Sequence, residues 1–262
     1  LAMRRMSRAS QELPGTLERK PSVLMLVYNR PLRNLMQNIA SQYGVSNGAV
    51  QISTYHSWLW WLYNKGFPNV IDYNKACPSD FNWDFTIVAD DLGHLADKGE
   101  LLYDHIFLDE AQDFPIALVK ILNAISSSMT VFMDRNQRIE EASESNPNLD
   151  YQSAVQFVLN LEITQALPLS ENHRNPQPIA DLAAKFLPDG SPPSECIKRG
   201  SRKPEIFVYR LLSDFFIRVD EYANENPDQT IAVLCTNPNL RSSALAELSA
   251  TNSSARECSS LL

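Results

Sequence analysis

Two adjacent carboxylates, Asp109 and Glu110, are the residues of this chain that are best placed to do chemistry. They follow the apolar run 106–108, and Pro115 opens a helical pattern a few residues later. A buried parallel strand ends at the sheet edge where ligands bind in open α/β folds. One carboxylate could hold Mg²⁺ there through its water shell, while its neighbour accepts a proton from an attacking water. The alternative is an acidic helix N-cap, because Asp and Glu are favoured in a first turn.

Strand-like and helix-like stretches alternate around these carboxylates. Apolar runs of strand length lie at 22–27, 50–53, 129–133 and 164–169, and stretches with helical periodicity at 31–43, 115–125, 151–159 and 176–186. This alternation predicts an α/β fold in which a mainly parallel sheet is covered by helices on both faces. The sheet is expected to position the carboxylates at one of its edges.

The region between the second and third strands is rich in aromatic residues. We expect a helix at 58–63, a loop at 64–82 and a weaker helix at 83–95. Large aromatic side chains are most often buried, so the sequence predicts packing in the core for this set: Trp58, Trp60, Trp61 and Tyr63.

The composition of the 262 residues is that of an ordinary soluble protein. There are 23 Lys and Arg residues against 31 Asp and Glu residues, which gives a net charge of −8, so contact with nucleic acid would require a local basic or polar groove. The four cysteines are far apart and form no CxxC pair, which favours a reducing compartment. No apolar run approaches the length of a membrane span. These features predict a cytoplasmic protein without a membrane partner.

The last quarter of the sequence has the pattern of a new βαβ unit. Residues 188–204 are rich in proline and glycine and are predicted to be a linker. Strands are expected at 205–209 and 230–235, with helices at 212–223 and from Pro238 onward. Two strands are too few to close a core of their own.

Five polar clusters at predicted strand ends resemble, in order and spacing, the motifs of superfamily 1 helicases of the UvrD/Rep type. LVYNRPL resembles motif Ia, ISTYHSW motif Ic, LDEAQD motif II (the Walker B box), VFMDRNQRI motif III and LSENHRNPQPIA motif IV. TIAVLCTNPNLRSSALAEL resembles the stretch that opens the second RecA-like domain of that family. The resemblance covers nearly the whole chain. It implies a RecA-like P-loop NTPase fold, with residues 1–187 as the first domain, 188–204 as the linker and 205–262 as the beginning of a second RecA-like domain.

The resemblance also implies ATP and Mg²⁺ as cofactors. Asp109 would hold Mg²⁺, and Glu110 would be the general base. Gln137 would sense the γ-phosphate, and Arg174 would be a cationic finger on the transferring group. Gln112 is expected among the residues that bind the nucleotide. Two alternatives stay open, namely a turn residue for Gln137 and a surface ion pair with Glu171 for Arg174.

Single-stranded DNA is the partner that the resemblance implies. Its contacts would be Asn29, Arg30, Thr54 and His56, because short polar and cationic groups at strand ends can reach backbone phosphates without reading the base sequence. The alternative for Asn29 is a turn residue, and for Thr54 and His56 it is a local cap of the following helix.

The sequence also departs from the family pattern. No GxxxxGK[ST] phosphate loop occurs, and the resemblance implies that this loop stands just before Leu1 and that motifs V and VI follow Leu262. Without the loop, the chain is expected to bind ATP poorly. Three acidic residues follow Gln137, at positions 140, 141 and 144, where they would repel a phosphate backbone. A helicase-like regulatory or defence NTPase without unwinding activity, or an inactive binding remnant, is therefore the alternative function.

Overall fold

The computed structural model describes residues 22–43, 45, 50–66, 73–79, 81–96, 102–134, 151–160, 167, 169, 171–187, 195–200, 202–235 and 237–251. Contacts divide the chain into two units, Leu1–Pro168 with Ser260–Leu262, and Leu169–Ser259. The predicted domain boundary after residue 187 falls inside the second unit. Gln137, the acidic residues that follow it and nearly all of the predicted strand 164–169 lie outside the described residues.

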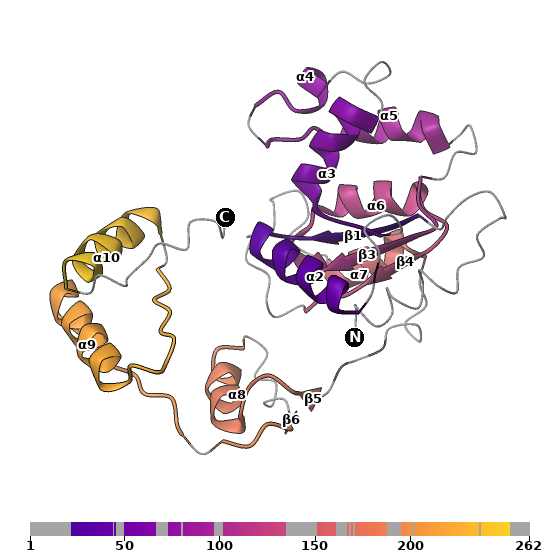
Figure 1. The fold of residues 1–262 in the computed structure, drawn as a ribbon. Coiled ribbons are helices and arrows are strands. Elements are labelled where there is room, and N and C mark those ends of the chain that lie inside the picture. Colours follow the sequence, from indigo (N-terminus) through magenta and orange to yellow (C-terminus); the bar gives the residue numbers. More distant parts are fainter. Residues whose placement is uncertain are drawn as a thin grey trace. The chain divides into compact units, whose positions relative to one another are not determined.

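The first unit is built on one parallel sheet of four strands. These are β1 (Val23–Val27), β2 (Val50–Thr54), β3 (His105–Asp109) and β4 (Met129–Val131), in the order β2-β1-β3-β4 (Figure 1). All three pairings are parallel. The α/β class, the parallel sheet and the positions of these strands are confirmed, although β4 ends two residues earlier than predicted.

Helices cover both faces of this sheet. Side chains of a strand point alternately to its two faces, so Leu24 and Leu26 of β1 enter one core, and Val23, Met25 and Val27 enter the other. Helix α2 (Arg30–Gln42) packs on the second core. The first core is covered by α3 (Tyr55–Trp61), α5 (Phe85–Ala96) and α6 (Ile116–Ala124), with Val155 of α7 (Tyr151–Val158) beside them (Figure 1). Because both faces are covered, all five residues of β1 are buried.

Only half of the predicted aromatic core is buried. Trp58 and Tyr63 are 0% and 2% exposed, whereas Trp60 and Trp61 are 48% and 42% exposed. The helical period explains the exposure of Trp60, which lies on the face of α3 opposite Trp58. Trp61 is one turn beyond Trp58 and is the last residue of α3. Helix α3 continues into a π-helical turn at Leu62–Gly66, and the short helix α4 (Tyr73–Ala76) lies within the stretch that was predicted to be a loop.

In its described residues, the second unit contains a two-stranded parallel sheet and three helices. Strands β5 (Glu171–Asn172) and β6 (Glu195–Cys196) pair, and α8 (Gln177–Ala184) lies between them in the chain. Helices α9 (Leu212–Glu225) and α10 (Pro238–Thr251) follow β6 (Figure 1). Strand β6 lies within the predicted linker. No helix in the described part of the chain is long and apolar enough to cross a membrane.

The strands predicted at 205–209 and 230–235 are wrong. Both stretches lie outside any strand, and the side chains of Ile206, Val208 and Leu234 are 73%, 91% and 94% exposed. A strand needs a neighbour for its backbone N–H and C=O groups, and neither stretch pairs with another in the described residues. The helical predictions on either side of these stretches are confirmed by α9 and α10.

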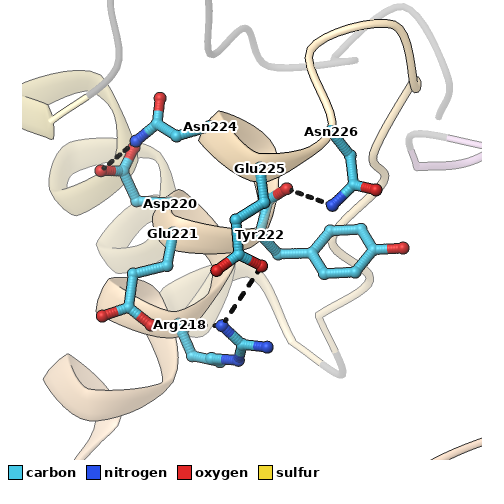
Figure 2. Close-up of polar contacts among 7 residues, drawn as sticks. All are labelled: Arg218, Asp220, Glu221, Tyr222, Asn224, Glu225 and Asn226. Carbon is cyan, nitrogen blue, oxygen red and sulfur yellow. Dashed lines mark hydrogen bonds and ion pairs between the residues drawn. The ribbon is translucent and has the colours of Figure 1, made fainter.

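The polar side chains of α9 form a solvated helix face (Figure 2). The Arg218 guanidinium lies 3.3 Å from the Glu221 carboxylate and 3.8 Å from that of Glu225. The Asn226 amide donates to the Tyr222 carbonyl at 2.9 Å and satisfies one of the last carbonyls of the helix. Exposed ion pairs of this kind contribute little to stability, so we interpret this cluster as a helix end and not as a binding site.

Trp58 and Trp60 provide a matched test of this packing. Trp58→Ala should lower the free energy of unfolding by about 3–5 kcal/mol, because it empties a fully buried site and removes the indole N–H that donates to the Tyr103 hydroxyl at 2.9 Å. Trp60→Ala on the same helix should have a much smaller effect, because that ring is half exposed. Urea unfolding followed by circular dichroism measures the free energy of unfolding of both variants. Equal losses of stability would contradict the assigned helix face.

Candidate functional site

Three strands of the first unit end at one edge of the sheet. In the parallel register, Val27 at the end of β1 lies beside Thr54 on one side and beside Asp109 on the other. The residues that directly follow these strands therefore leave the sheet at a common edge. The structure thus brings seven of the predicted site residues to one edge of one unit: Asn29, Arg30, Thr54, His56, Asp109, Glu110 and Gln112.

A cleft of about 410 Å³ opens at this edge. One wall comes from the end of β1 and the first turns of α2, and the other from the turn after β3. The lining residues are Tyr28, Asn29, Pro31, Leu32, Leu35, Glu110, Gln112 and Asp113. Two of these side chains are acidic and none is a lysine or arginine. The cleft is large enough for a small ligand, and its charge favours a ligand that carries a cation over a bare anion.

Glu110 has a left-handed backbone, with φ 57° and ψ 45°. For a residue with a Cβ, this conformation costs about 1–2 kcal/mol. It reverses the chain directly after β3 and leads into the 3₁₀ turn Ala111–Asp113. Such strain at the mouth of a cleft is a reason to suspect function at this residue.

The Gln112 side chain holds the Glu110 carboxylate in place. Its amide nitrogen donates to a Glu110 carboxylate oxygen at 2.7 Å, and its amide oxygen accepts from the backbone N–H of Asp134 at 3.0 Å. Gln112 is 2% exposed. A backbone bond from Ala111 N–H to the Phe132 carbonyl, 3.0 Å long, joins the same two segments. The structure gives Gln112 a positioning role, and its direct contact with a nucleotide stays a prediction.

Asp109 and Glu110 fit a magnesium ion that is bound together with a nucleotide. No group of three or more His, Cys, Asp or Glu side chains that could hold a metal occurs among the described residues. Mg²⁺ at nucleotide sites commonly uses only one or two carboxylates and takes its other ligands from phosphates and water. Asp109 ends β3 beside Val27 and is half-buried, which suits such a ligand. A carboxylate pair of this kind could hold a metal only with further ligands from phosphate or water, and ATP with Mg²⁺ stays a prediction.

Asn29 and Thr54 each cap the helix that follows their strand. The Asn29 side-chain oxygen accepts from Leu32 N–H at 2.9 Å. The Thr54 hydroxyl accepts from Ser57 N–H at 3.4 Å and donates to the Ser57 hydroxyl at 2.9 Å. Thr54 is buried, whereas Asn29 and its neighbour Arg30 are exposed. The capping alternative is confirmed for Thr54, and Asn29 is likewise a cap. Contacts of these residues with nucleic acid stay predictions.

His56 is held as a neutral ring in an aromatic cluster. The Trp83 indole N–H donates to His56 Nδ1 at 3.0 Å, so the neutral ring carries its proton on Nε2. Its centroid lies 3.8 Å from that of Tyr55 and 5.2 Å from that of Phe81. Burial lowers the pKa of His56 to about 4. At neutral pH the residue offers a flat ring and one N–H donor, and not the positive charge expected of a cationic phosphate contact.

Arg174 belongs to the second unit. Its backbone N–H and that of Asn175 both donate to the Asn172 side-chain oxygen at 3.0 Å, which fixes the turn after β5. The carboxylate of Glu171 lies 3.3 Å from His173 Nε2. The finger role of Arg174 stays a prediction, and Gln137 lies outside the described residues.

Among the polar side chains that line the cleft, sequence reasoning missed those of Tyr28 and Asp113. Both had a signal in the sequence. Tyr28 directly follows β1, and Asp113 ends the LDEAQD segment three residues after Glu110. Their place in the cleft follows from the close approach of the two strand ends.

Neither a protein-family model nor a curated protein sequence matches the chain. The fold and the cleft by themselves define an α/β protein with an acidic cleft at the carboxyl edge of a parallel sheet.

The backbone strain at Glu110 can be measured by comparing two substitutions. Glu110→Gly should be more stable to unfolding than Glu110→Ala by about 1 kcal/mol, because only glycine adopts a left-handed backbone without a steric penalty. Both variants lose the bond to Gln112, so their difference isolates the backbone. The midpoints of urea unfolding of the two variants measure this difference in stability. If Glu110→Ala were the more stable variant, the left-handed assignment would be wrong.

His56 should make the stability depend on pH. The unfolded chain binds a proton at this residue below about pH 6.5, whereas the folded chain resists protonation until about pH 4. The free energy of unfolding contributed by His56 is therefore fully present above pH 6.5 and is lost as the pH falls toward 4. His56→Asn, which can still accept from Trp83, should lose less stability over this range in urea unfolding at several pH values. Half-buried His105, whose pKa is also lowered by desolvation, is present in both proteins. Identical profiles for the two proteins would contradict the burial of His56.

Proposed function

We propose that this chain is part of an ATP-dependent DNA helicase or translocase of RecA-like fold, which couples ATP hydrolysis to movement on single-stranded DNA. The observation that carries the proposal is Glu110, which has a strained backbone, is held by Gln112 and lines an acidic cleft. It directly follows Asp109, the last residue of β3. Two carboxylates at a strand end, one half-buried and one held by an amide, suit the hydrolysis of a magnesium-bound phosphoanhydride.

Each residue of the proposed site has its own task. When bound, Mg²⁺ and ATP supply the phosphoryl group that water attacks. Asp109 would hold the metal through its water shell, and Glu110 would accept the proton of the attacking water. Gln112 fixes the Glu110 carboxylate by the 2.7 Å bond. Gln137 and Arg174 are proposed as the γ-phosphate sensor and the cationic finger.

The nucleic-acid side of the proposal uses the same sheet edge. Asn29 lines the cleft and also caps α2, and the exposed Arg30 is the first residue of that helix. A ligand that shifts the end of β1 would therefore also shift the start of α2. The junction of β1 and α2 is therefore a physical route by which the bound nucleotide could change the affinity for a phosphate backbone.

A regulatory or defence NTPase that does not unwind DNA is the second candidate. Three of the four predicted nucleic-acid contacts carry no positive charge at neutral pH, because Asn29 and Thr54 are uncharged caps and His56 is neutral. The acidic residues at positions 140, 141 and 144 also favour this candidate, because they would repel a phosphate backbone. Displacement of a labelled strand from a duplex distinguishes this candidate from a helicase.

Replacing the proposed general base tests the hydrolysis. In a version of the protein that carries a phosphate loop ahead of Leu1, Glu110→Gln should lower ATP turnover in the presence of single-stranded DNA by about 10²–10⁴-fold, because the amide cannot accept the proton of water. Phosphate release measures the rate. Glu221→Gln, which alters an exposed carboxylate of α9 (Figure 2), should leave the rate unchanged. Turnover that survives Glu110→Gln would show that the general base is elsewhere.

A further inference from the structure

Phe81 occupies a position that stability alone does not explain. Its φ is 58°, a left-handed conformation that is unfavourable for a bulky side chain. It lies in a tight turn in which Asn82 N–H donates to the Ser79 carbonyl at 2.9 Å. Glycine is the residue favoured at such a position. The Phe81 ring is also 60% exposed, so burial offsets little of the backbone cost.

The inner edge of this ring rests on a ladder of aromatic rings. Phe81 meets His56 at 5.2 Å and 71°, and His56 lies over Tyr55 at 3.8 Å and 34°. Tyr55 meets Phe114 edge-on at 5.5 Å. Tyr55 and Phe114 are 8% and 2% exposed, and the bond from Trp83 fixes the His56 ring. An exposed ring is therefore held in a defined place by buried ones.

The ladder ends next to the candidate cleft. Phe114 directly follows the 3₁₀ turn Ala111–Asp113, which contains Gln112 and Asp113 of the cleft wall. Tyr55 directly follows β2, whose end is in register with the end of β1. The exposed ring is thus connected through packed side chains to the turn that carries Glu110.

The surroundings of Phe81 suit a nucleobase better than a protein surface. Its described neighbours along the chain, Ser79 and Asn82, are polar, so the ring is a single apolar group in a polar turn. A stable protein interface buries about 800 Å² on each partner and needs a larger apolar centre. Asp84 uses its carboxylate as a cap, accepting from Thr86 N–H at 2.9 Å. One flat exposed ring backed by a neutral imidazole is the arrangement on which bases stack.

We propose that Phe81, supported by His56, is a stacking platform for a base of a single-stranded nucleic acid. The proposal rests on the proposed function for its choice of partner, but it concerns binding and does not require ATP hydrolysis. It places base contact on the turn after α4 instead of on the segment after Gln137.

Substitution by glycine separates a functional role of Phe81 from a structural one. Phe81→Gly should weaken binding of a fluorescein-labelled oligo(dT) by about 5- to 100-fold at fixed salt, the range expected for the loss of one stacked base. The same variant should have an unchanged or higher urea midpoint, since glycine fits the left-handed backbone. Phe81→Trp should retain binding. Phe157→Ala removes another exposed phenylalanine of the first unit, which is 87% exposed, and should bind normally.

An abasic oligonucleotide of the same length completes the test. This oligonucleotide keeps the phosphates and lacks the bases, so it should bind more weakly than oligo(dT). Its affinity should be the same for the unaltered protein and for Phe81→Gly. Equal loss of affinity for both oligonucleotides, or a lower urea midpoint, would overturn the stacking role. Normal binding of oligo(dT) by Phe81→Gly would overturn this inference and leave the proposed function standing. Failure of the unaltered protein to bind any oligonucleotide would remove the nucleic-acid function itself.

Discussion

The parallel pairing of β3 with β1 is the constraint on which the candidate site depends. Its register sets Asp109 beside Val27, and the pairing of β1 with β2 sets Val27 beside Thr54. Apolar cores cover both faces of the sheet along these ladders. A slip of one residue would exchange the side chains that each strand presents to the two cores, so that neither core would keep its packing. The cores therefore fix the register, and the register decides which side chains meet at the edge.

The turn after β3 gives the Glu110 carboxylate a fixed orientation at this edge of the sheet. The left-handed backbone of Glu110 is unfavourable, and it is held by bonds on both sides of the turn. One is the backbone bond from Ala111 to Phe132, and the other is the Gln112 amide between Glu110 and Asp134. Both bonds end on the segment that follows β4. This short strand therefore also helps to position the turn that carries Glu110. The two bonds offset the cost of the turn and keep the carboxylate oriented.

The sequence predicted the central elements of the first unit well, because their signals are local. Five apolar residues in a row require burial on both faces of a strand, as in β1, and Pro31 marks the start of α2. The carboxylates could be placed at a sheet edge because parallel strands bring equivalent ends together. The Gln112 clamp could not be foreseen, since its partner lies 22 residues away along the chain. The left-handed backbone of Phe81 also has no signal, because phenylalanine does not favour it.

The two stretches at 205–209 and 230–235 show the opposite case, in which a strand-like sequence has no sheet to join. Most of their apolar side chains are exposed, and neither stretch pairs with a strand among the described residues. Such segments are templates for pairing with identical segments of other molecules, which is the first step of aggregation. Concentrated solutions of the chain should therefore tend to precipitate through the second unit, and solubilising substitutions belong at Val208 and Leu234 and not in the core of the first unit.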